Sequence, residues 1–292
     1  MGNRSSSPEP QHGSSPPPAP LLTTPWREIT WGNKEELLQY IKNFEPQNEE
    51  VEAIRVLLHG PVGAGKSSFI NSANNVLQGR MTQEALANNT TNDNSFTKEY
   101  KTHTFKKEKG KENVYPFVFN DVMGLEEGNG VRADDIKLAL KGHVMDGYKF
   151  NPVSPLSDVD PGYNSSPSIS DRVHVLVCIY DANAPEMKQP VLKKMREIRE
   201  AASDLGIPQM AILTHIDEAC GETERNLRNV YKSTYLKKKM RDFSSSLGIP
   251  MNCILPVKNY SDETQMNPDV DDLILSALRL MVDFGDDYAD KL

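Results

Sequence analysis

The chain has 292 residues, and its 33 basic and 41 acidic side chains give a formal net charge of −8. This length suffices for a buried core, and the acidic balance excludes non-specific binding of DNA or RNA, which needs a basic face to neutralise phosphates. Three cysteines without close pairing, no apolar run near the roughly 20 residues of a membrane span, and no signal-peptide core together indicate a soluble, intracellular protein.

The first 25 residues are rich in Ser, Pro and Gly, with almost no large apolar side chain before Leu21. Such a composition cannot form a core, so we predict a disordered tail over residues 1–25. Met1 to Ser6 also fits the pattern that N-myristoylation enzymes read, with Gly2 as the acceptor. Two interpretations stay open: a plain tail, or a lipid at Gly2 that by itself binds membranes weakly, with an association constant of about 10⁴ M⁻¹.

Residues 26–50 predict a short helical lead-in. Asn33 is a suitable N-cap, and apolar residues up to Phe44 recur at helical spacing until Pro46 stops the helix. We therefore expect order to begin near Trp26, with one helix before the main domain.

From about Val51 the pattern changes to strand, phosphate loop and helix, followed by strands that alternate with amphipathic helices. This pattern is typical of a mostly parallel sheet covered on both faces. We therefore predict a doubly wound α/β domain of the P-loop NTPase, GTPase-like class over residues 51–290. Its six strands are predicted at residues 54–59, 99–106, 114–120, 173–180, 209–213 and 252–256.

Helices are predicted between these strands from the spacing of apolar residues. They cover residues 132–148, a segment with apolar positions from Val191 to Leu205, another from Leu227 to Leu247, and a last helix with Asn267 as cap and Pro268 in its first turn.

Residues 147–170 interrupt this alternation. They contain four prolines, several serines and little periodicity, which predicts a long surface insertion. Loops of this length are usually functional or disordered, and the sequence does not choose between the two.

Residues 60–67 (GPVGAGKS) form a complete Walker A loop between an apolar strand and an amphipathic helix. The glycines let the backbone curl so that successive N–H groups point at phosphate oxygens, and the helix start adds its positive end. Lys66 is expected on the β- and γ-phosphates, and the Ser67 hydroxyl on Mg²⁺. The residues predicted to cradle the phosphates are Gly60, Gly63, Ala64, Gly65, Lys66, Ser67 and Ser68.

Asp121 follows the predicted strand at 114–120, so its carboxylate is expected at the C-terminal edge of the sheet beside the phosphates. It begins the sequence Asp-Val-Met-Gly, and the glycine of such a DxxG loop senses the γ-phosphate through its backbone N–H in nucleotide switches. We predict Asp121 as a magnesium ligand through water and Gly124 as a nucleotide contact. Without the Walker A loop upstream, a plain turn would explain this pattern equally well.

Thr214, His215 and Asp217 follow the strand at 209–213 and are predicted to select the base. An ionised aspartate only accepts hydrogen bonds, so Asp217 suits the N1–H and 2-amino groups of guanine, two donors that adenine lacks. GTP is therefore favoured over ATP. His215 stands where GTPases usually carry a lysine that packs over the base, so we expect a weaker affinity. An ordinary turn capped by Asp217 is the alternative.

Two further contacts are predicted from their place in the pattern. Residues 257–259 follow the last strand and are the candidate for a final base contact, with Lys258 as the binding residue. The polar stretch 94–98 suits a mobile switch loop. Its Thr97 is the expected Mg²⁺ ligand of the triphosphate state, with Thr90, Thr91 and Thr102 as rivals.

Hydrolysis is predicted to be slow. Leu125 follows Gly124 at the position where Ras-type switches carry a water-orienting glutamine, and leucine cannot polarise a water molecule. Glu126, Glu127 or a group from a partner remain as substitutes. The sequence thus predicts nucleotide binding and leaves a weak GTPase activity open.

The combination of these motifs resembles the interferon-induced protein 44 and 44-like family over roughly residues 25–285. The segments that carry the resemblance are residues 25–31, the P-loop with its continuation to Ser72, residues 95–98, residues 121–125 and residues 214–217. The resemblance implies a cytoplasmic, interferon-responsive protein with GTP or GDP and Mg²⁺ as cofactors. It also implies protein partners in antiviral or inflammatory signalling, and it leaves a homodimer open. Longer members carry a further N-terminal domain where this chain has its Ser/Pro tail, so the role of that domain is not carried over.

Two other functions compete with a guanine-nucleotide switch. A non-enzymatic adaptor would keep the P-loop domain as a structural relic and would work through the tail or residues 147–170. An ATP-using P-loop kinase is disfavoured by Asp217. The three hypotheses differ in which nucleotide, if any, stabilises the fold.

Overall fold

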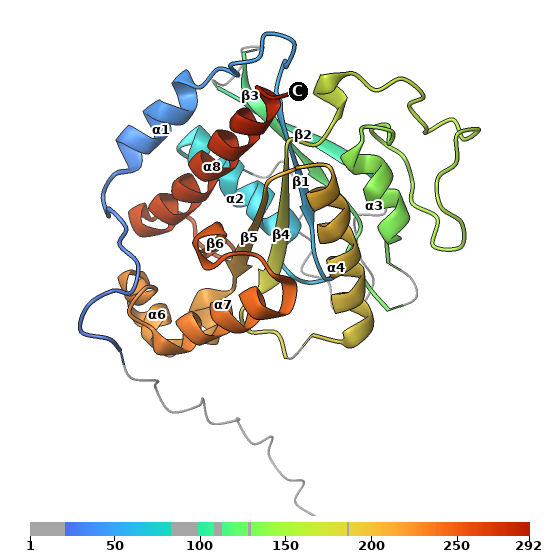
Figure 1. Cartoon of the computed structure of the whole chain (residues 1–292). Coiled ribbons are helices and arrows are strands. Elements are labelled where there is room, and N and C mark those ends of the chain that lie inside the picture. Colours follow the sequence, from blue (N-terminus) through green and yellow to red (C-terminus); the bar gives the residue numbers. More distant parts are fainter. Residues whose placement is uncertain (1–20, 83–98, 108–112, 128–129, 186) are drawn as a thin grey trace, which may run out of the picture.

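The computed structural model describes residues 21–82, 99–107, 113–127, 130–185 and 187–292. Within these residues, six strands form one sheet in the order β2-β3-β1-β4-β5-β6, and every neighbouring pair is parallel except β2 and β3 (Figure 1). The predicted fold class is confirmed, and the predicted strand boundaries are right to within two residues. The strands are β1 (Ile54–His59), β2 (Lys101–Lys106), β3 (Val114–Asp121), β4 (Val175–Asp181), β5 (Gln209–Thr214) and β6 (Ile254–Pro256).

Helices cover both faces of the sheet (Figure 1). One face carries α1 (Lys34–Asn43), α2 (Lys66–Gln78) and α8 (Pro268–Ala289), and the other carries α3 (Ala133–Leu140), α4 (Gln189–Asp204) and α7 (Thr234–Leu247). The central strands β1 and β4 are buried by both layers, which explains why most of their residues are apolar. The remaining short helices are α5 (Ile216–Ala219), α6 (Gly221–Arg225), η1 (Ile169–Asp171), η2 (Leu227–Asn229) and η3 (Met251–Cys253). In the described part of the chain, no helix has the length and apolar character that crossing a bilayer requires.

Two of the predicted helices are wrong in length. The helix predicted over 132–148 ends at Leu140, because Gly142 adopts a left-handed φ of +85° and the backbone N–H of Gly142 bonds back to Ala139. The segment predicted from Leu227 is a short 3₁₀ turn, and α7 begins only after Ser233, whose side chain caps it by accepting from the N–H of Leu236.

The two predicted N-caps behave differently. Asn267 caps α8 as predicted, since its side-chain oxygen accepts from the backbone N–H of Asp269 at 2.9 Å. Asn33 precedes α1 as predicted, but its side chain makes no capping hydrogen bond. The first turn of α1 is stabilised instead by its acidic residues, Glu35 and Glu36, which face the positive end of the helix.

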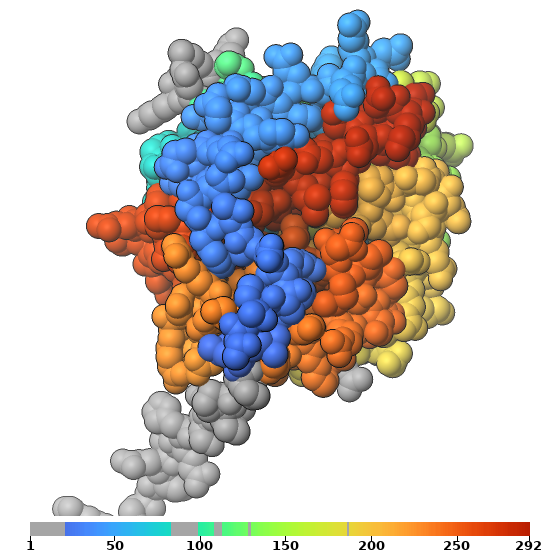
Figure 2. Space-filling model, turned by 60° about the vertical axis from the view of Figure 1, so that its left-hand side comes forward, coloured from blue at the N-terminus to red at the C-terminus, as the bar shows by residue number. Residues whose placement is uncertain are grey.

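The lead-in helix α1 packs on α8 and shares its apolar core. Leu37 and Ile41 are buried there, and Figure 2 shows the blue lead-in lying beside the red α8. Lys34 forms an ion pair of 2.8 Å with Asp271, a residue of α8 whose side chain is fully buried. Residues 26–50 are therefore held by both apolar and ionic contacts.

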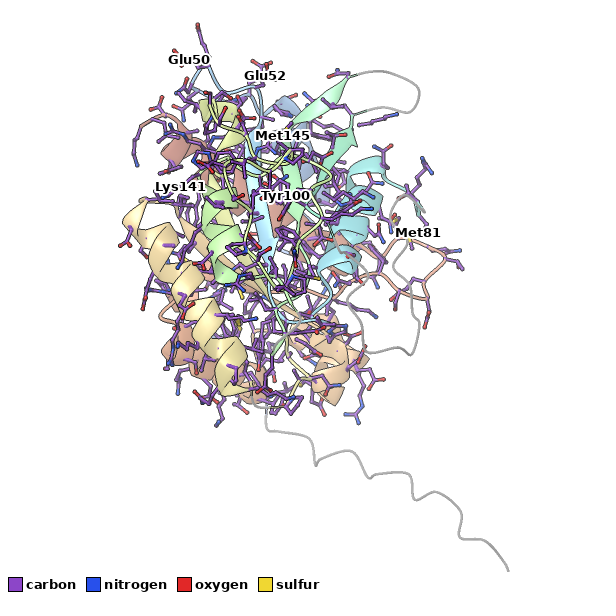
Figure 3. The ribbon with its side chains drawn as sticks, turned by 90° about the vertical axis from the view of Figure 1, so that its right-hand side faces the viewer. Glu50, Glu52, Met81, Tyr100, Lys141 and Met145 are labelled. Carbon is purple, nitrogen blue, oxygen red and sulfur yellow. The ribbon has the colours of Figure 1, made fainter. Side chains whose placement is uncertain are left out.

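The insertion at 147–170 is attached to the body by several hydrogen bonds, two of which reach the start of β2 and α3. At its start, the backbone N–H of Tyr100 donates to the carbonyl of Tyr148 at 2.8 Å, and Figure 3 labels Tyr100 at this junction. Further along, the backbone N–H of Leu156 donates to the Asp135 carboxylate of α3 at 2.8 Å. The insertion therefore joins the start of β2 to α3, two elements that flank the predicted switch segments.

Candidate nucleotide site

The P-loop follows β1 and curls into the start of α2. Gly60 has φ +148°, and a Cβ there would overlap the carbonyl oxygen of Ile179 on β4, so only glycine fits. Gly63 and Gly65 adopt φ values of +77° and +85°, which L side chains rarely adopt. The sequence thus folds this segment into the curl that turns backbone N–H groups toward one point.

Lys66 lies inside this curl and is only 8% exposed. Its ammonium Nζ donates to the carbonyls of Gly60 at 3.2 Å and Pro61 at 3.1 Å. Burial lowers the pKa of Lys66, and the nearby Asp121 carboxylate opposes that shift. A cation held on weak carbonyl acceptors has a stronger partner available in any phosphate that enters the loop.

The two predicted metal ligands that the structure describes meet each other. The Ser67 hydroxyl donates to Oδ2 of Asp121 at 3.0 Å, so α2 and the end of β3 bring a hydroxyl and a carboxylate to one place. Oxygen ligands of this kind suit Mg²⁺, which is usually held by one or two protein groups together with phosphates and water. The donor set therefore fits the predicted ion.

The DxxG loop packs directly against the P-loop. A Cβ on Gly124 would lie 2.8 Å from the Cα of Val62, so the two backbones touch. The backbone N–H of Leu125 donates to the carbonyl of Gly60 at 3.0 Å. The side chain of Leu125 is 1% exposed and belongs to the core between the sheet and α3–α4. The loop is thus placed to sense the P-loop through its backbone, while Leu125 serves packing.

The segment after β5 lies beside the start of α2. The buried Thr214 hydroxyl is 2.8 Å from the carbonyl of Ala64 and 3.2 Å from that of Tyr180. His215 adopts a left-handed φ of +51°, and its Nδ1 is 3.2 Å from Asp181 at the end of β4. The hydrogen bond to Asp181 raises the pKa of His215, which burial opposes. A Cβ on Gly65 would lie 3.4 Å from the His215 ring, so the ring borders the phosphate loop.

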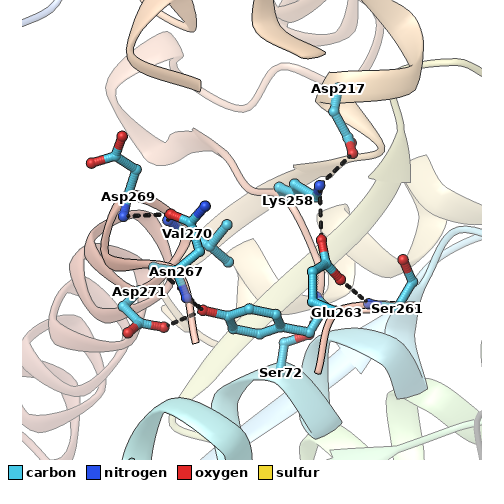
Figure 4. A network of polar contacts seen from close by, with 10 residues as sticks. Ser72, Asp217, Lys258, Ser261, Glu263, Asn267, Asp269, Val270 and Asp271 are labelled. Atoms are coloured by element: carbon cyan, nitrogen blue, oxygen red, sulfur yellow. Dashed lines mark hydrogen bonds and ion pairs between the residues drawn. The ribbon is translucent and has the colours of Figure 1, made fainter. Parts of the chain in front are cut away.

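Asp217 and Lys258, the two residues predicted to contact the base, form an ion pair (Figure 4). The Lys258 Nζ is 3.2 Å from Oδ2 of Asp217 and 2.9 Å from Oε1 of Glu263. The amide Nδ2 of Asn259 is 3.4 Å from the carbonyl of Gly65. The loop after β6 therefore reaches both Asp217 and the phosphate loop.

Comparison with known proteins agrees with these motifs. Interferon-induced protein 44 of Mus musculus is 34% identical over 257 residues, which are 88% of this chain and 60% of that protein. Interferon-induced protein 44-like of Homo sapiens is 34% identical over 263 residues, 89% of this chain and 58% of that protein. The resemblance to the interferon-induced protein 44 family is confirmed.

The chain spans less than two thirds of the length of these interferon-induced protein 44 relatives. No protein-family model matches the sequence. Among solved structures, Toc33 from Arabidopsis thaliana in complex with Mg²⁺ and GMPPNP aligns with a TM-score of 0.48 at 14% identity, covering 88% of this chain and 93% of that chain.

In this chain, the described site residues gather at the C-terminal edge of the sheet. Thr97 lies in residues 83–98, outside the described part of the chain. Ser68 lies in the first turn of α2, where its carbonyl accepts from the Ser72 hydroxyl. The residues that come together are Gly60, Gly63, Ala64, Gly65, Lys66, Ser67, Ser68, Asp121, Gly124, Thr214, His215, Asp217 and Lys258.

Two residues of this cluster were not predicted. Asp181 orients His215, and Glu263 holds Lys258. Asp181 does carry one signal, because a carboxylate at the end of a parallel strand lies at the binding edge of the sheet. Glu263 lies in a polar loop in which nothing distinguishes it from its acidic neighbour Asp262.

Proposed function

We propose that this chain binds a guanine nucleotide with Mg²⁺ at residues 60–67 and acts as a nucleotide switch of the interferon-induced, antiviral response in the cytoplasm. One observation carries the proposal: the groups suited to phosphate, metal and base converge on a single edge of the sheet. These groups are Lys66 in its glycine curl, Ser67 with Asp121, and Asp217 with Lys258. The role in the interferon response follows the names of the relatives.

The residues divide the work by their chemistry. The backbone N–H groups of the P-loop and the Lys66 ammonium hold the β- and γ-phosphates. The Ser67 hydroxyl and the Asp121 carboxylate hold Mg²⁺, which when bound neutralises phosphate charge. Asp217 accepts from the N1–H and 2-amino groups of guanine. Lys66 exchanges its carbonyl partners for phosphate oxygens, which strengthens each hydrogen bond because both partners then carry charge.

Hydrolysis is proposed to be slow unless a partner assists it. The buried position of Leu125 supports this, because a side chain packed between the sheet and α3 does not reach an attacking water. The backbone contact of Leu125 with Gly60 is independent of the side chain, so sensing does not require a catalytic residue here.

Residues 147–170 are the surface proposed to report the bound nucleotide. They are bonded to Tyr100 beside β2 and to Asp135 on α3, and α3 follows the DxxG loop along the chain. Val153 and Val159 on this insertion are 84% and 86% exposed. A shift of either predicted switch segment would therefore move the backbone of residues 147–170, which presents these apolar side chains to partners. The same exposure favours the second candidate, an adaptor that uses the insertion without any nucleotide.

Thermal unfolding with and without Mg·GTP tests the proposal. A ligand at 100 times its dissociation constant adds about 2.7 kcal/mol to the free energy of unfolding. We expect this stabilisation in the wild type, a loss of most of it in Lys66→Ala, and a weaker response to GTP in Asp217→Asn. Lys238→Ala is the matched control, because Lys238 pairs with Asp242 on the exposed face of α7 and should leave the response unchanged.

Two outcomes contradict the proposal. A wild-type protein whose unfolding does not change with millimolar Mg·GTP has a relic P-loop, and the adaptor function then stands. Equal stabilisation by ATP and GTP contradicts the base assignment and revives the ATP-using alternative.

A further inference from the structure

We propose that the Lys258 ammonium donates a hydrogen bond to O6 of guanine, beside the two bonds that Asp217 accepts, and that Glu263 positions the lysine for this contact. The inference rests on the proposed function and deepens it. It assigns a side-chain partner to O6 of guanine, and it explains why a lysine, a glutamate and an aspartate meet at this point.

The geometry places one donor directly beside two acceptors. The Lys258 Nζ lies 3.2 Å from Oδ2 of Asp217, so the ammonium is next to one of the two carboxylate oxygens. An ammonium has three N–H donors. Two of them serve Asp217 and Glu263, and within the described part of the chain no further acceptor is paired with the third. The side chains are partly exposed, at 27% for Lys258 and 20% for Asp217, so a base can reach them.

Lys258 supplies one donor and Asp217 supplies two acceptors, an order that is complementary to guanine and mismatched with adenine. Guanine presents O6 as an acceptor, then N1–H and the 2-amino group as donors, whereas adenine presents an amino donor followed by the N1 acceptor. Lys258 Nζ, Asp217 Oδ2 and Asp217 Oδ1 match the three guanine groups in sequence. Adenine would face an ammonium with its amino group and a carboxylate with its N1 lone pair, and polar groups left unpaired in this way produce strong discrimination.

The loop that carries Lys258 is fixed to the same helix that starts at the phosphate loop. The backbone N–H of Tyr260 donates to the Ser72 hydroxyl of α2 at 2.9 Å, and the Tyr260 hydroxyl donates to Asp271 of α8 at 2.6 Å (Figure 4). The backbone N–H of Val257 donates to the carbonyl of Leu213 at 2.8 Å. The distance between phosphate and base contacts is therefore set by rigid elements, which lowers the ordering cost of binding.

Glu263 is a positioning residue, because it touches Lys258 rather than the base. Its Oε2 accepts from the backbone N–H of Ser261 at 2.8 Å, so its own carboxylate is fixed. Burial lowers the pKa of Lys258, but the hydrogen bond to Glu263 and the charge of Asp217 outweigh this effect and raise it. The lysine consequently keeps its charge and its three donors at neutral pH.

The experiment compares GTP with 6-thio-GTP, in which sulfur, a poorer acceptor, replaces O6. Dissociation constants are measured by competition with a fluorescent guanine nucleotide in the wild type, Lys258→Met, Glu263→Gln and the surface control Lys238→Met. We expect the wild type and the control to prefer GTP by about 10-fold. In Lys258→Met, GTP binding should weaken by about 10- to 100-fold and the preference over 6-thio-GTP should fall toward one. Glu263→Gln should lower the preference in part.

The outcomes separate this inference from the function on which it rests. If the wild type binds GTP and Lys258→Met keeps the full preference for GTP over 6-thio-GTP, Lys258 does not contact O6 and only the inference falls. If the wild type binds neither nucleotide, the proposed function and the inference fall together. Should Lys258→Met not fold, the preference in Glu263→Gln decides, and an unchanged value overturns the inference.

Discussion

Leu125 shows how one residue can keep a switch contact while its side chain does something else. Its backbone N–H donates to Gly60 in the P-loop, and its side chain is buried among apolar residues of the sheet and α3–α4. A glutamine at this position in Ras-type switches orients water from an exposed loop. Here the same position is buried, so the residue packs the loop against the core and cannot orient a water molecule.

Leu125→Gln is therefore expected to destabilise the fold without accelerating hydrolysis. The amide would replace apolar contacts and enter a core that offers it few partners, which lowers the free energy of unfolding by about 2–4 kcal/mol. Urea unfolding and single-turnover hydrolysis of GTP measure the two effects. Leu125→Met, which conserves volume, should cost less than about 1.5 kcal/mol. A glutamine variant that hydrolyses GTP faster at undiminished stability would contradict this account of Leu125.

At this scale the sequence predicts residues that a local motif defines and misses those that the fold recruits. Lys66, Asp121 and Asp217 were predicted because loop chemistry and strand ends determine their positions. Asp181 and Glu263 belong to the same site, but each acts through a partner on a different strand or loop. Their roles depend on which strands are neighbours in the sheet, and spacing along the chain does not contain that information.

At the scale of elements, α8 connects the lead-in to the base-reading loop. Asp271 of α8 is fully buried. It forms an ion pair with Lys34 of α1 and accepts a hydrogen bond from the hydroxyl of Tyr260, which lies two residues after Lys258. Removal of either partner of a buried carboxylate leaves a polar group inside the protein without its compensating contact. The contact therefore couples α1 to the nucleotide edge through one side chain.

Lys34→Met tests this coupling. We expect the free energy of unfolding to fall by about 2 kcal/mol, less than the 3–5 kcal/mol of a fully buried pair because Lys34 is 22% exposed. Urea unfolding measures the change. Lys193→Met is the control, since Lys193 is 80% exposed in its pair with Glu197 and should change stability by less than about 0.5 kcal/mol. Equal effects of the two substitutions would show that Asp271 does not need Lys34.

The strands could be predicted well and the segment 132–148 could not, for a physical reason. A strand buried on both faces is mostly apolar whatever its neighbours are, so β1 and β4 can be predicted from the sequence. The end of α3 depends on Gly142, where a Cβ would lie 2.9 Å from the backbone of Asp171. That close approach involves Asp171, a residue far along the chain. The apolar periodicity continues past Gly142, so it does not reveal that the helix ends before the glycine.

At the scale of the whole molecule, two buried histidines connect stability to pH. Burial lowers the pKa of His59 to about 3 and that of His174 to about 4, so both are neutral in the folded protein at neutral pH. A group whose pKa is depressed by folding contributes stability above its unfolded value near 6.5, and this contribution is lost as pH falls toward the folded value. Acid should therefore weaken the fold as the pH falls below about 6.5.

His174 allows the cleaner test, because His59 directly precedes the phosphate loop. The Nδ1 of His174 accepts from the backbone N–H of Arg55 at 2.9 Å, and its Nε2 lies 3.2 Å from the carbonyl of Ile169, so the ring must be neutral and joins β1 to β4 and η1. Protonation would place a second N–H against that of Arg55. Because folding shifts the pKa of His174 from about 6.5 to about 4, lowering the pH from 7 to 5 removes about 2 kcal/mol of stability.

His174→Asn keeps a side-chain acceptor near Arg55 and does not titrate. We expect the variant to be less stable at pH 7 and its deficit to shrink by about 2 kcal/mol at pH 5, as measured by urea unfolding at both values. A deficit that stays constant over this interval would mean that His174 does not carry the acid sensitivity of the fold.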